Sequence, residues 1–229
     1  MIADIKVIYK DKNLIAINKP VGMPSQSDPT GDADALSLTS ALLASMEERA
    51  ELYLLHRLDR GVGGVLVFAR NKKTAADVSA LIAERKVEKE YIAIARGCAA
   101  EGEYRDLLYK DARQGKSFVA SRVRSGVKEA LLYAKVLERK TIERGEVTLL
   151  KLSLFTGRHH QIRVQTSTRG TPLLGDKKYG DNDRLTRYPA LFATKVAFTL
   201  GAEKYEFSAS VDAGAYPWCE MDTLKGEVT

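Results

Sequence analysis

Residues 56–69 read HRLDRGVGGVLVFA, a polar, glycine-rich loop that runs directly into a short apolar strand. Glycines at positions 61, 63 and 64 permit a tight turn or a positive φ beside the carboxylate of Asp59. Arginines flank this carboxylate in the sequence, and neighbouring cations favour the charged form, so we expect Asp59 to be ionised at neutral pH. An ionised, positioned carboxylate can serve as a nucleophile, a general base or a metal ligand. Taken alone, the loop is better interpreted as a surface salt-bridge cluster beside a turn.

Short apolar segments dominate the chain on both sides of this loop. β-Branched and apolar runs predict strands, and apolar residues at helical spacing predict helices. Strands are expected at 5–9, 14–18, 64–69, 90–96, 147–155, 191–200 and 204–211, with further candidates between 101 and 144. Helices are expected at 36–48 and 74–85, and a third is expected to be capped by Thr156 and ended by Gly170.

The order of these elements indicates the fold class. Strands and helices do not alternate regularly, which argues against a doubly wound parallel sheet. We therefore predict an α+β fold, with a mixed, mainly antiparallel sheet and flanking helices. A chain of 229 residues fits one large domain or two closely packed halves.

The composition is that of a globular protein with a basic balance. Hydrophobic residues make up 45% of the chain, and 36 Lys+Arg against 30 Asp+Glu give a formal charge of +6. A positive excess attracts polyanions, although many basic proteins bind no nucleic acid. Two cysteines at distant positions, no signal-peptide pattern and no apolar run long enough to span a bilayer predict a cytoplasmic protein.

Three further segments contain residues with the chemistry of a site. Residues 18–24 (NKPVGMP) end a strand in a Pro/Gly turn, which alone indicates only turn chemistry. Tyr91, in 89–94 (KEYIAI), is either a packing residue or a flat ring on which a base stacks. Residues 156–163 (TGRHHQIR) precede PLLGD and YG at 172–180, and a helix there would put His159 and Arg163 on one face.

The histidines do not form a metal motif. His159 and His160 are adjacent in sequence, so they would point in different directions from a helix, and His56 lies far away in the chain. No cysteine or carboxylate stands near them at ligand spacing. We predict no metal site.

These segments together resemble the RluA-type family of RNA pseudouridine synthases, over nearly the whole chain. The order is similar to that family's: NKPxGMP, HRLD, KxYxA, TGRxHQIR and then GDxxYG. The resemblance implies the pseudouridine synthase fold, a single catalytic domain over residues 1–229, and no separate RNA-binding domain of the S4 type.

The resemblance also implies roles for five residues. Asp59 matches the family's essential aspartate, and Arg163 matches the arginine that pairs with it. Tyr91 matches the tyrosine that stacks on the target uracil and has been proposed to take part in proton transfer. Arg57 matches a residue that fills the space left by the flipped nucleotide, and Ile162 matches an apolar residue beneath the active site.

The chain departs from the family pattern at two places. It has Val62-Gly63-Gly64 where the family usually has Thr-Ser-Gly, and Gln165 where a histidine is common. Neither change removes a charged catalytic group. The implied activity is the isomerisation of specific uridines in rRNA or tRNA to pseudouridine, by a monomer without cofactor, nucleotide or membrane partner. The absence of a GxGxxG or GxxxxGK[ST] phosphate loop agrees with that expectation.

Two alternatives stay open at this point. A catalytically silent RNA-binding protein of the same fold is favoured by the altered loop at 62–64, but retention of Asp59, Tyr91 and Arg163 counts against it. A metal-dependent hydrolase would use Asp59, Asp176 and the histidines, at spacings that suit a metal poorly.

Overall fold

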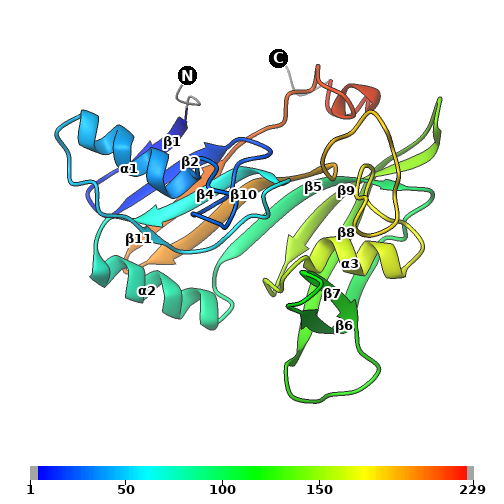
Figure 1. Cartoon of the computed structure of the whole chain (residues 1–229), viewed down its shortest axis with the longest axis horizontal. Helices are drawn as coiled ribbons and strands as arrows, with labels where there is room; N and C mark the ends of the chain where they lie inside the picture. Colours follow the sequence, from blue (N-terminus) through cyan, green and yellow to red (C-terminus); the bar gives the residue numbers. More distant parts are fainter. Residues whose placement is uncertain (1–4, 226–229) are drawn as a thin grey trace. The chain divides into compact units, whose positions relative to one another are not determined.

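The structure, a computed structural model, describes residues 5–225, which form two compact units (Figure 1). The first unit holds residues 5–89 and Ala193–Ser210, and the second holds Glu90–Phe192 and residues 211–225. The elements in chain order are β1 (Lys6–Lys10), β2 (Leu14–Lys19), α1 (Ala35–Ser45), β3 (Tyr53–Leu54), β4 (Gly63–Ala69), α2 (Lys72–Ala83), β5 (Glu88–Arg96), β6 (Gly102–Asp111), β7 (Lys116–Val119), β8 (Val127–Ile142), β9 (Gly145–Leu154), α3 (Gln161–Thr168), β10 (Leu191–Leu200), β11 (Glu203–Ser208) and the short 3₁₀ helix η1 (Trp218–Glu220).

The first unit is a sheet in the order β1-β2-β4-β10-β11, with the short β3 also paired to β4. The pairs β1/β2, β2/β4 and β10/β11 are antiparallel. Alternate residues of β2 and β4 pack with Val78 of α2, because successive side chains of a strand point to opposite faces. The members of this cluster are Leu14, Ala16, Val65, Val67, Ala69, Val78, Val87, Val196, Phe198, Tyr205 and Phe207.

Both helices of the first unit begin at a capping side chain. Asp34 accepts a hydrogen bond from the backbone N–H of Ser37 at 2.9 Å, and Asn71 accepts one from Thr74 at 2.9 Å. Such a cap satisfies a backbone donor that has no partner inside the helix. The caps therefore explain why α1 and α2 begin where they do.

Gly64 is required where β4 passes β10. Its φ is +111°, and a Cβ at this position would lie 2.1 Å from the carbonyl oxygen of Ala193. No side chain fits that space, and L residues rarely adopt that backbone conformation. The unusual Val62-Gly63-Gly64 sequence thus keeps the glycine that the geometry demands, and Val62 itself is buried.

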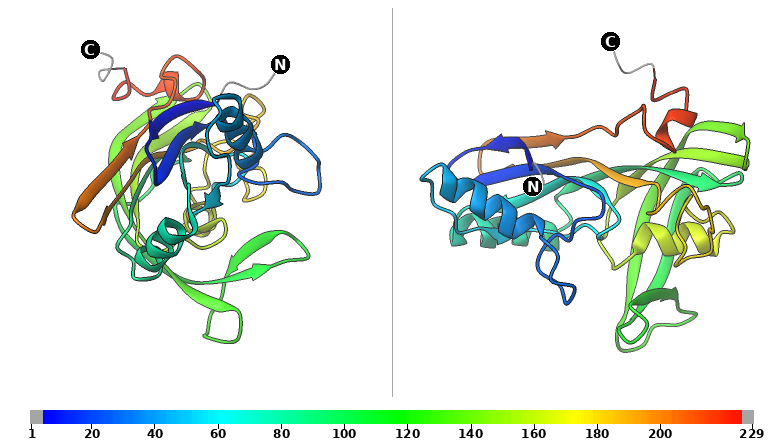
Figure 2. Two further views of the ribbon diagram at one scale, coloured as in Figure 1. Left: turned by 90° about the vertical axis from the view of Figure 1, so that its left-hand side faces the viewer. Right: turned by 45° about the horizontal axis from the view of Figure 1, so that its top comes forward.

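The second unit is a sheet in the order β5-β9-β8-β6-β7, and every one of these neighbouring pairs is antiparallel. Helix α3 packs on it through Val164, which joins Leu108, Ala130 and Tyr179 in a buried cluster. Strand β7 contacts α3, and the ends of β6 and β8 extend beyond this helix with the loop 120–126 (Figure 2). They form a protruding arm of this unit.

The α+β class with a mixed, mainly antiparallel sheet is confirmed, and the predicted strands and helices are present with shifts of a few residues. The predicted cap at Thr156 is wrong. Helix α3 begins at Gln161 after His160, whose left-handed φ of 54° keeps residues 156–160 out of the helix. The predicted end is confirmed, because Gly170 has a φ of +76° directly after the C-cap Arg169.

Candidate active site

The Asp59 loop is tied to the end of β2 by a buried lysine. Lys19 has no exposed surface, and its Nζ donates hydrogen bonds to the carbonyls of Pro20 (2.9 Å), Met23 (2.6 Å) and Arg60 (3.4 Å). Burial lowers the pKa of Lys19 to about 7, the Asp59 carboxylate raises it and Arg60 lowers it further. Lys19 therefore braces the loop, and its protonated form places a positive charge near Asp59.

Two more contacts hold the same loop in place. Ser25 Oγ donates to the carbonyl of Leu58 at 2.8 Å and accepts from the N–H of Leu58 at 3.0 Å. The N–H of Gly22 donates to the carbonyl of Arg60 at 2.8 Å. The NKPVGMP segment, which alone indicated only a turn, is thus the support on which the Asp59 loop rests.

The side chain of Arg60, the arginine after Asp59, interacts with the 28–32 loop. Its guanidinium forms ion pairs with Asp28 (3.0 Å) and Asp32 (2.5 Å), and the side chain of Arg57 is exposed. Arg60, one of the two arginines that flank Asp59, is therefore engaged by the 28–32 loop. The charge of Arg60 is compensated by Asp28 and Asp32, and the Asp59 carboxylate raises the pKa of Lys19.

His56 begins the loop as a neutral acceptor. Its Nε2 accepts a hydrogen bond from the N–H of Val67 at 3.2 Å, in the middle of β4. Burial, and then the positive charge of Lys89, lower the pKa of His56 to about 3. The imidazole is uncharged at neutral pH, which suits a structural contact to the strand.

Arg163 on α3 is held by a buried carboxylate. Its Nε donates to Asp176 Oδ2 at 2.7 Å and its Nη2 to Oδ1 at 2.8 Å, with Asp176 fully buried. Two parallel charge-assisted bonds of this kind fix the plane of a guanidinium. The Tyr179 ring lies 5.2 Å from the Arg163 Cζ. Asp176, which sequence reasoning considered only as a metal ligand, is therefore the residue that orients Arg163.

The start of α3 depends on the TGRHHQ segment. Gln161 Oε1 accepts from Thr156 Oγ1 (2.7 Å) and from the N–H of Arg158 (3.0 Å), which closes the loop on the helix. His159 lies before the helix, so it does not share a helical face with Arg163. Its ring stacks on His160 with centroids 3.7 Å apart, which corrects the expectation that the two rings diverge.

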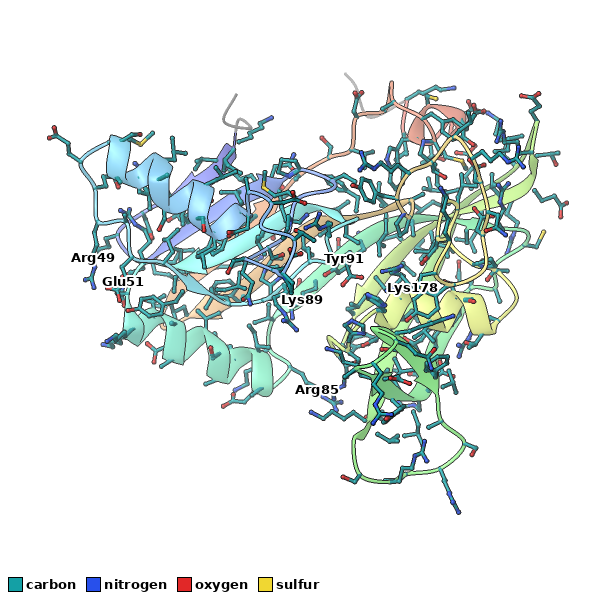
Figure 3. The ribbon with its side chains drawn as sticks, viewed as in Figure 1. Arg49, Glu51, Arg85, Lys89, Tyr91 and Lys178 are labelled. Carbon is teal, nitrogen blue, oxygen red and sulfur yellow. The ribbon has the colours of Figure 1, made fainter. Side chains whose placement is uncertain are left out.

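The predicted site residues lie in both units. Asp59 and Arg57 belong to the first, and Tyr91, Ile162 and Arg163 belong to the second. Tyr91 lies on β5 (Figure 3), where it is buried and pairs with Leu152 of β9. Ile162 is buried beside Arg163 at the start of α3.

Sequence reasoning missed Lys19 and the orienting role of Asp176. A signal was present for each: Lys19 ends the apolar strand LIAINK, and Asp176 follows the apolar run Leu173-Leu174 and a glycine. Charged residues are rarely fully buried unless they are paired. A charged side chain within an apolar stretch of sequence therefore indicates that it is paired with a buried partner.

Two structural features are absent from residues 5–225. In that range no group of three or more His, Cys, Asp or Glu side chains is arranged to hold a metal ion. None of the helices there has the length and apolar character needed to cross a membrane.

Comparison with known proteins gives consistent matches. Residues 13–168, more than half of the chain, match the family model for RNA pseudouridylate synthase. The chain is 34% identical over 184 residues to ribosomal large subunit pseudouridine synthase C of Rickettsia bellii, covering 80% of this chain and 58% of that protein. It is 35% identical over 192 residues to tRNA pseudouridine synthase C of Haemophilus ducreyi, covering 80% and 78%. The chain spans 56% to 63% of the length of several of these relatives.

Solved structures agree on the fold. Human RNA pseudouridylate synthase domain containing 4 superposes with a TM-score of 0.73 at 26% identity, covering 90% of this chain and 88% of that one. Human RNA pseudouridylate synthase domain containing 1 gives a TM-score of 0.76 at 24% identity, covering 92% and 85%. The α+β architecture is therefore the pseudouridine synthase fold. By sequence order, family model and fold, this chain belongs to the RNA pseudouridine synthase family of the RluA type.

Proposed function

We propose that this chain converts selected uridines in RNA to pseudouridine, with the carboxylate of Asp59 as the catalytic group. One observation carries the proposal. The chain belongs to a family named for this reaction, and it retains an aspartate, a tyrosine and an arginine at the matching positions 59, 91 and 163. The bracing of the Asp59 loop by Lys19 and Ser25 supports it, because a catalytic carboxylate must be held in place.

The reaction explains why so few groups are needed. The bond from ribose C1′ to uracil N1 breaks, the base turns, and a bond forms between C1′ and C5. N1 gains a proton and C5 loses one, so the product is an isomer and nothing is oxidised. The carboxylate attacks C1′, attacks C6 of the base, or assists departure of uracil to a glycal. These three roles require an anionic oxygen near C1′ and C6 and a platform for the loose base.

We assign Arg163 as the charge partner of Asp59. A guanidinium stays ionised and offers a fork to a carboxylate. The bidentate contact with Asp176 supports this role, because it orients the guanidinium before any substrate is bound. A partner that is already oriented loses less entropy in the reaction.

Tyr91, Arg57 and Ile162 are assigned to handling of the nucleotide. Extruding a uridine from structured RNA costs a few kcal/mol, and stacking on an aromatic ring returns about 1–3 kcal/mol. In this proposal Tyr91 supplies the ring, Arg57 fills the vacated position in the helix, and Ile162 packs beneath the base. The exposure of Arg57 supports its role, since a residue that enters RNA must be accessible.

The substrate in this proposal is ribosomal or transfer RNA, the two classes named in its relatives. We infer a cytoplasmic enzyme that acts as a monomer, without a metal or other cofactor. The net charge of +6 supports an RNA substrate, because it favours encounter with a polyanion.

The direct test maps pseudouridines in total RNA from cells with and without the gene, and in the same RNA after incubation with the purified chain. The proposal requires at least one uridine position whose pseudouridine signal disappears without the gene and returns with the protein. RNA binding without any such position would instead support a catalytically silent RNA-binding protein, to which the altered 62–64 segment gives some support.

A further inference from the structure

Most of the net charge of the chain sits on one hairpin. Residues 109–128 comprise the end of β6, the strand β7, the loop after it and the start of β8, and we call this segment the basic hairpin. It contains six cations and one carboxylate, a net charge of +5 out of +6 for the whole chain. The cations are Lys110, Arg113, Lys116, Arg122, Arg124 and Lys128.

The carboxylate of this segment is used within the turn itself. Asp111 Oδ1 accepts from the N–H groups of Arg113 (2.8 Å) and Gln114 (3.1 Å). Among residues 5–225, no salt bridge joins any of the six cations of the basic hairpin to an acidic side chain. All of them except Lys116 are exposed. Their mutual repulsion is thus not offset by neighbouring carboxylates of the described chain.

Aromatic rings are interleaved with these cations. Tyr109 lies opposite Phe118 in the β6/β7 register, so the two rings share a face of the hairpin with Lys116. The Arg124 Cζ lies 5.3 Å from the centroid of the Tyr109 ring, and the Lys116 Nζ lies 5.5 Å from that of Phe118. Cations alternating with flat rings are the arrangement by which proteins bind single-stranded nucleic acid.

Apolar side chains on the same segment are unusually exposed. The exposed fractions are 37% for Phe118, 41% for Val119 and 76% for Val123. A phosphate backbone alone would leave these side chains in water. A strand with unpaired bases would cover the apolar groups with base faces while its phosphates meet the cations.

The base of the basic hairpin is held firmly within its unit. The N–H of Ser117 donates to Tyr179 Oη at 2.7 Å, and Ser117 Oγ donates to the carbonyl of His159 at 2.7 Å. Lys178, which is labelled in Figure 3, donates a hydrogen bond from its Nζ to the carbonyl of Gly115 at 3.0 Å. These contacts link the hairpin to the segments that flank α3, so its cationic face is presented from a fixed base.

We propose that the basic hairpin is a second RNA-binding surface, which grips a single-stranded stretch of the substrate away from the target uridine. Its cations bind phosphates and Phe118 stacks on an unpaired base. The inference rests on the proposed function for its choice of RNA as the partner. It assigns the hairpin to affinity and substrate choice, with no part in the chemistry at Asp59.

The test compares matched variants of the full chain. Arg122→Gln/Arg124→Gln removes two cations of the basic hairpin, and Lys72→Gln/Lys73→Gln removes two exposed cations at the start of α2. The probe is a short fluorescent RNA of mixed sequence, single-stranded or annealed to its complement, titrated at several salt concentrations. Thermal unfolding shows that each variant is folded.

We expect the hairpin variant to bind single-stranded RNA about tenfold more weakly at low salt, with a salt slope reduced by about 1.4, since each phosphate contact contributes about 0.7. The α2 control should stay within about twofold of the parent chain. Phe118→Ala should weaken single-stranded binding by about tenfold and leave the salt slope unchanged, because stacking involves no counterion release.

A hairpin variant that binds with the affinity and slope of the parent or of the α2 control would overturn the inference, and a protein would then be the better candidate for this surface. If Phe118→Ala weakened binding of single-stranded RNA and of duplex RNA equally, the stacking role would be contradicted. Pseudouridine formation by the unaltered chain is measured in parallel. If none forms while the hairpin variant still loses RNA binding, the proposed function fails and the hairpin inference stands.

Discussion

At the scale of single residues, the candidate site depends on ions that are buried and specifically paired. Lys19 donates to three backbone carbonyls, and Asp176 binds Arg163 through two parallel hydrogen bonds. Removing one partner of such a buried pair leaves a charge without compensation, which costs far more than breaking an exposed pair. These residues are therefore the most sensitive probes of the account.

Asp176→Asn tests whether Asp176 positions Arg163. The amide is nearly isosteric but neutral, so the bidentate charge-assisted contact is lost and the free energy of unfolding should fall by about 3–5 kcal/mol. Below the melting temperature of the variant, kcat for pseudouridine formation should drop while RNA affinity changes little. Arg105→Gln breaks an exposed pair with Glu103 and Glu129 and is the control, with little expected change. An Asp176 variant as stable and active as this control would remove the positioning role.

Tyr91 tests the stacking platform at the same scale. Tyr91→Phe keeps the ring, so RNA binding should be largely retained, whereas Tyr91→Ala should lose base placement as well as turnover. A role of the hydroxyl would appear as slow turnover in the Phe variant alone. Single-turnover rates and RNA affinities measure the two effects separately. Turnover of the Ala variant at the parental rate would reduce Tyr91 to a packing residue of β5.

At the scale of elements, the sequence predicts those strands and helices whose positions are determined by the spacing of apolar residues and by turn residues. The expected strand at 64–69 is β4 (Gly63–Ala69), and the expected helix at 74–85 is α2 (Lys72–Ala83). One face of each element is buried, so its apolar residues recur at a regular spacing. That spacing is visible in the local sequence. The predicted start of α3 is wrong, because His160 adopts a left-handed conformation that no local sequence pattern indicates.

The candidate site was predictable only in part for the same reason. The order of the segments indicates Asp59, Tyr91 and Arg163 through resemblance to a family. The partners Lys19–Arg60, Ser25–Leu58 and Arg163–Asp176 are tertiary contacts between separate segments, and hydrogen bonds of this kind have no local sequence signature. The ion pairs of Arg60 with Asp28 and Asp32 are likewise tertiary contacts that no local pattern indicates.

Lys19→Met tests the junction between the end of β2 and the Asp59 loop. The carbonyls of Met23 and Arg60 would lose a buried donor, so the free energy of unfolding should decrease by about 2 kcal/mol. The melting temperature should then fall by about 4–8 °C, and pseudouridine formation should slow because the loop is less firmly held. Lys12→Met, at an exposed lysine of the β1–β2 turn, is the control. Equal melting temperatures for the two variants would contradict a bracing role for Lys19.

At the scale of the whole molecule, charge governs both the proposed RNA binding and the response to pH. The net charge of +6 predicts RNA binding that weakens steeply as salt rises, and the basic hairpin carries most of that charge. Each unit also holds a histidine that stays neutral when folded. The pKa of His56 is lowered to about 3, first by burial and then by Lys89, and that of His160 to about 2, first by burial and then by Arg163.

These histidines predict destabilisation by acid. Above a pH of about 6.5 both are neutral in the folded and unfolded chain; below it the unfolded chain takes up protons that the folded chain does not. Stability should therefore fall as the pH drops from about 6.5, by up to about 1.4 kcal/mol per histidine and pH unit. Melting temperatures between pH 7 and 5 measure this before most carboxylates titrate. His56→Gln keeps an acceptor for Val67 and should flatten the curve, whereas a parent chain with a constant melting temperature in that range would refute the prediction.

The central claim, that Asp59 is the catalytic group, is tested most directly by the rate of pseudouridine formation in Asp59→Asn. The substitution keeps the size of the side chain but removes the anionic oxygen that the reaction requires. On a uridine that the parent chain converts, the account predicts no detectable product, with the melting temperature and RNA affinity close to those of the parent. A folded Asn variant that forms pseudouridine at an undiminished rate would contradict the account, because Asp59 would not be the catalytic group.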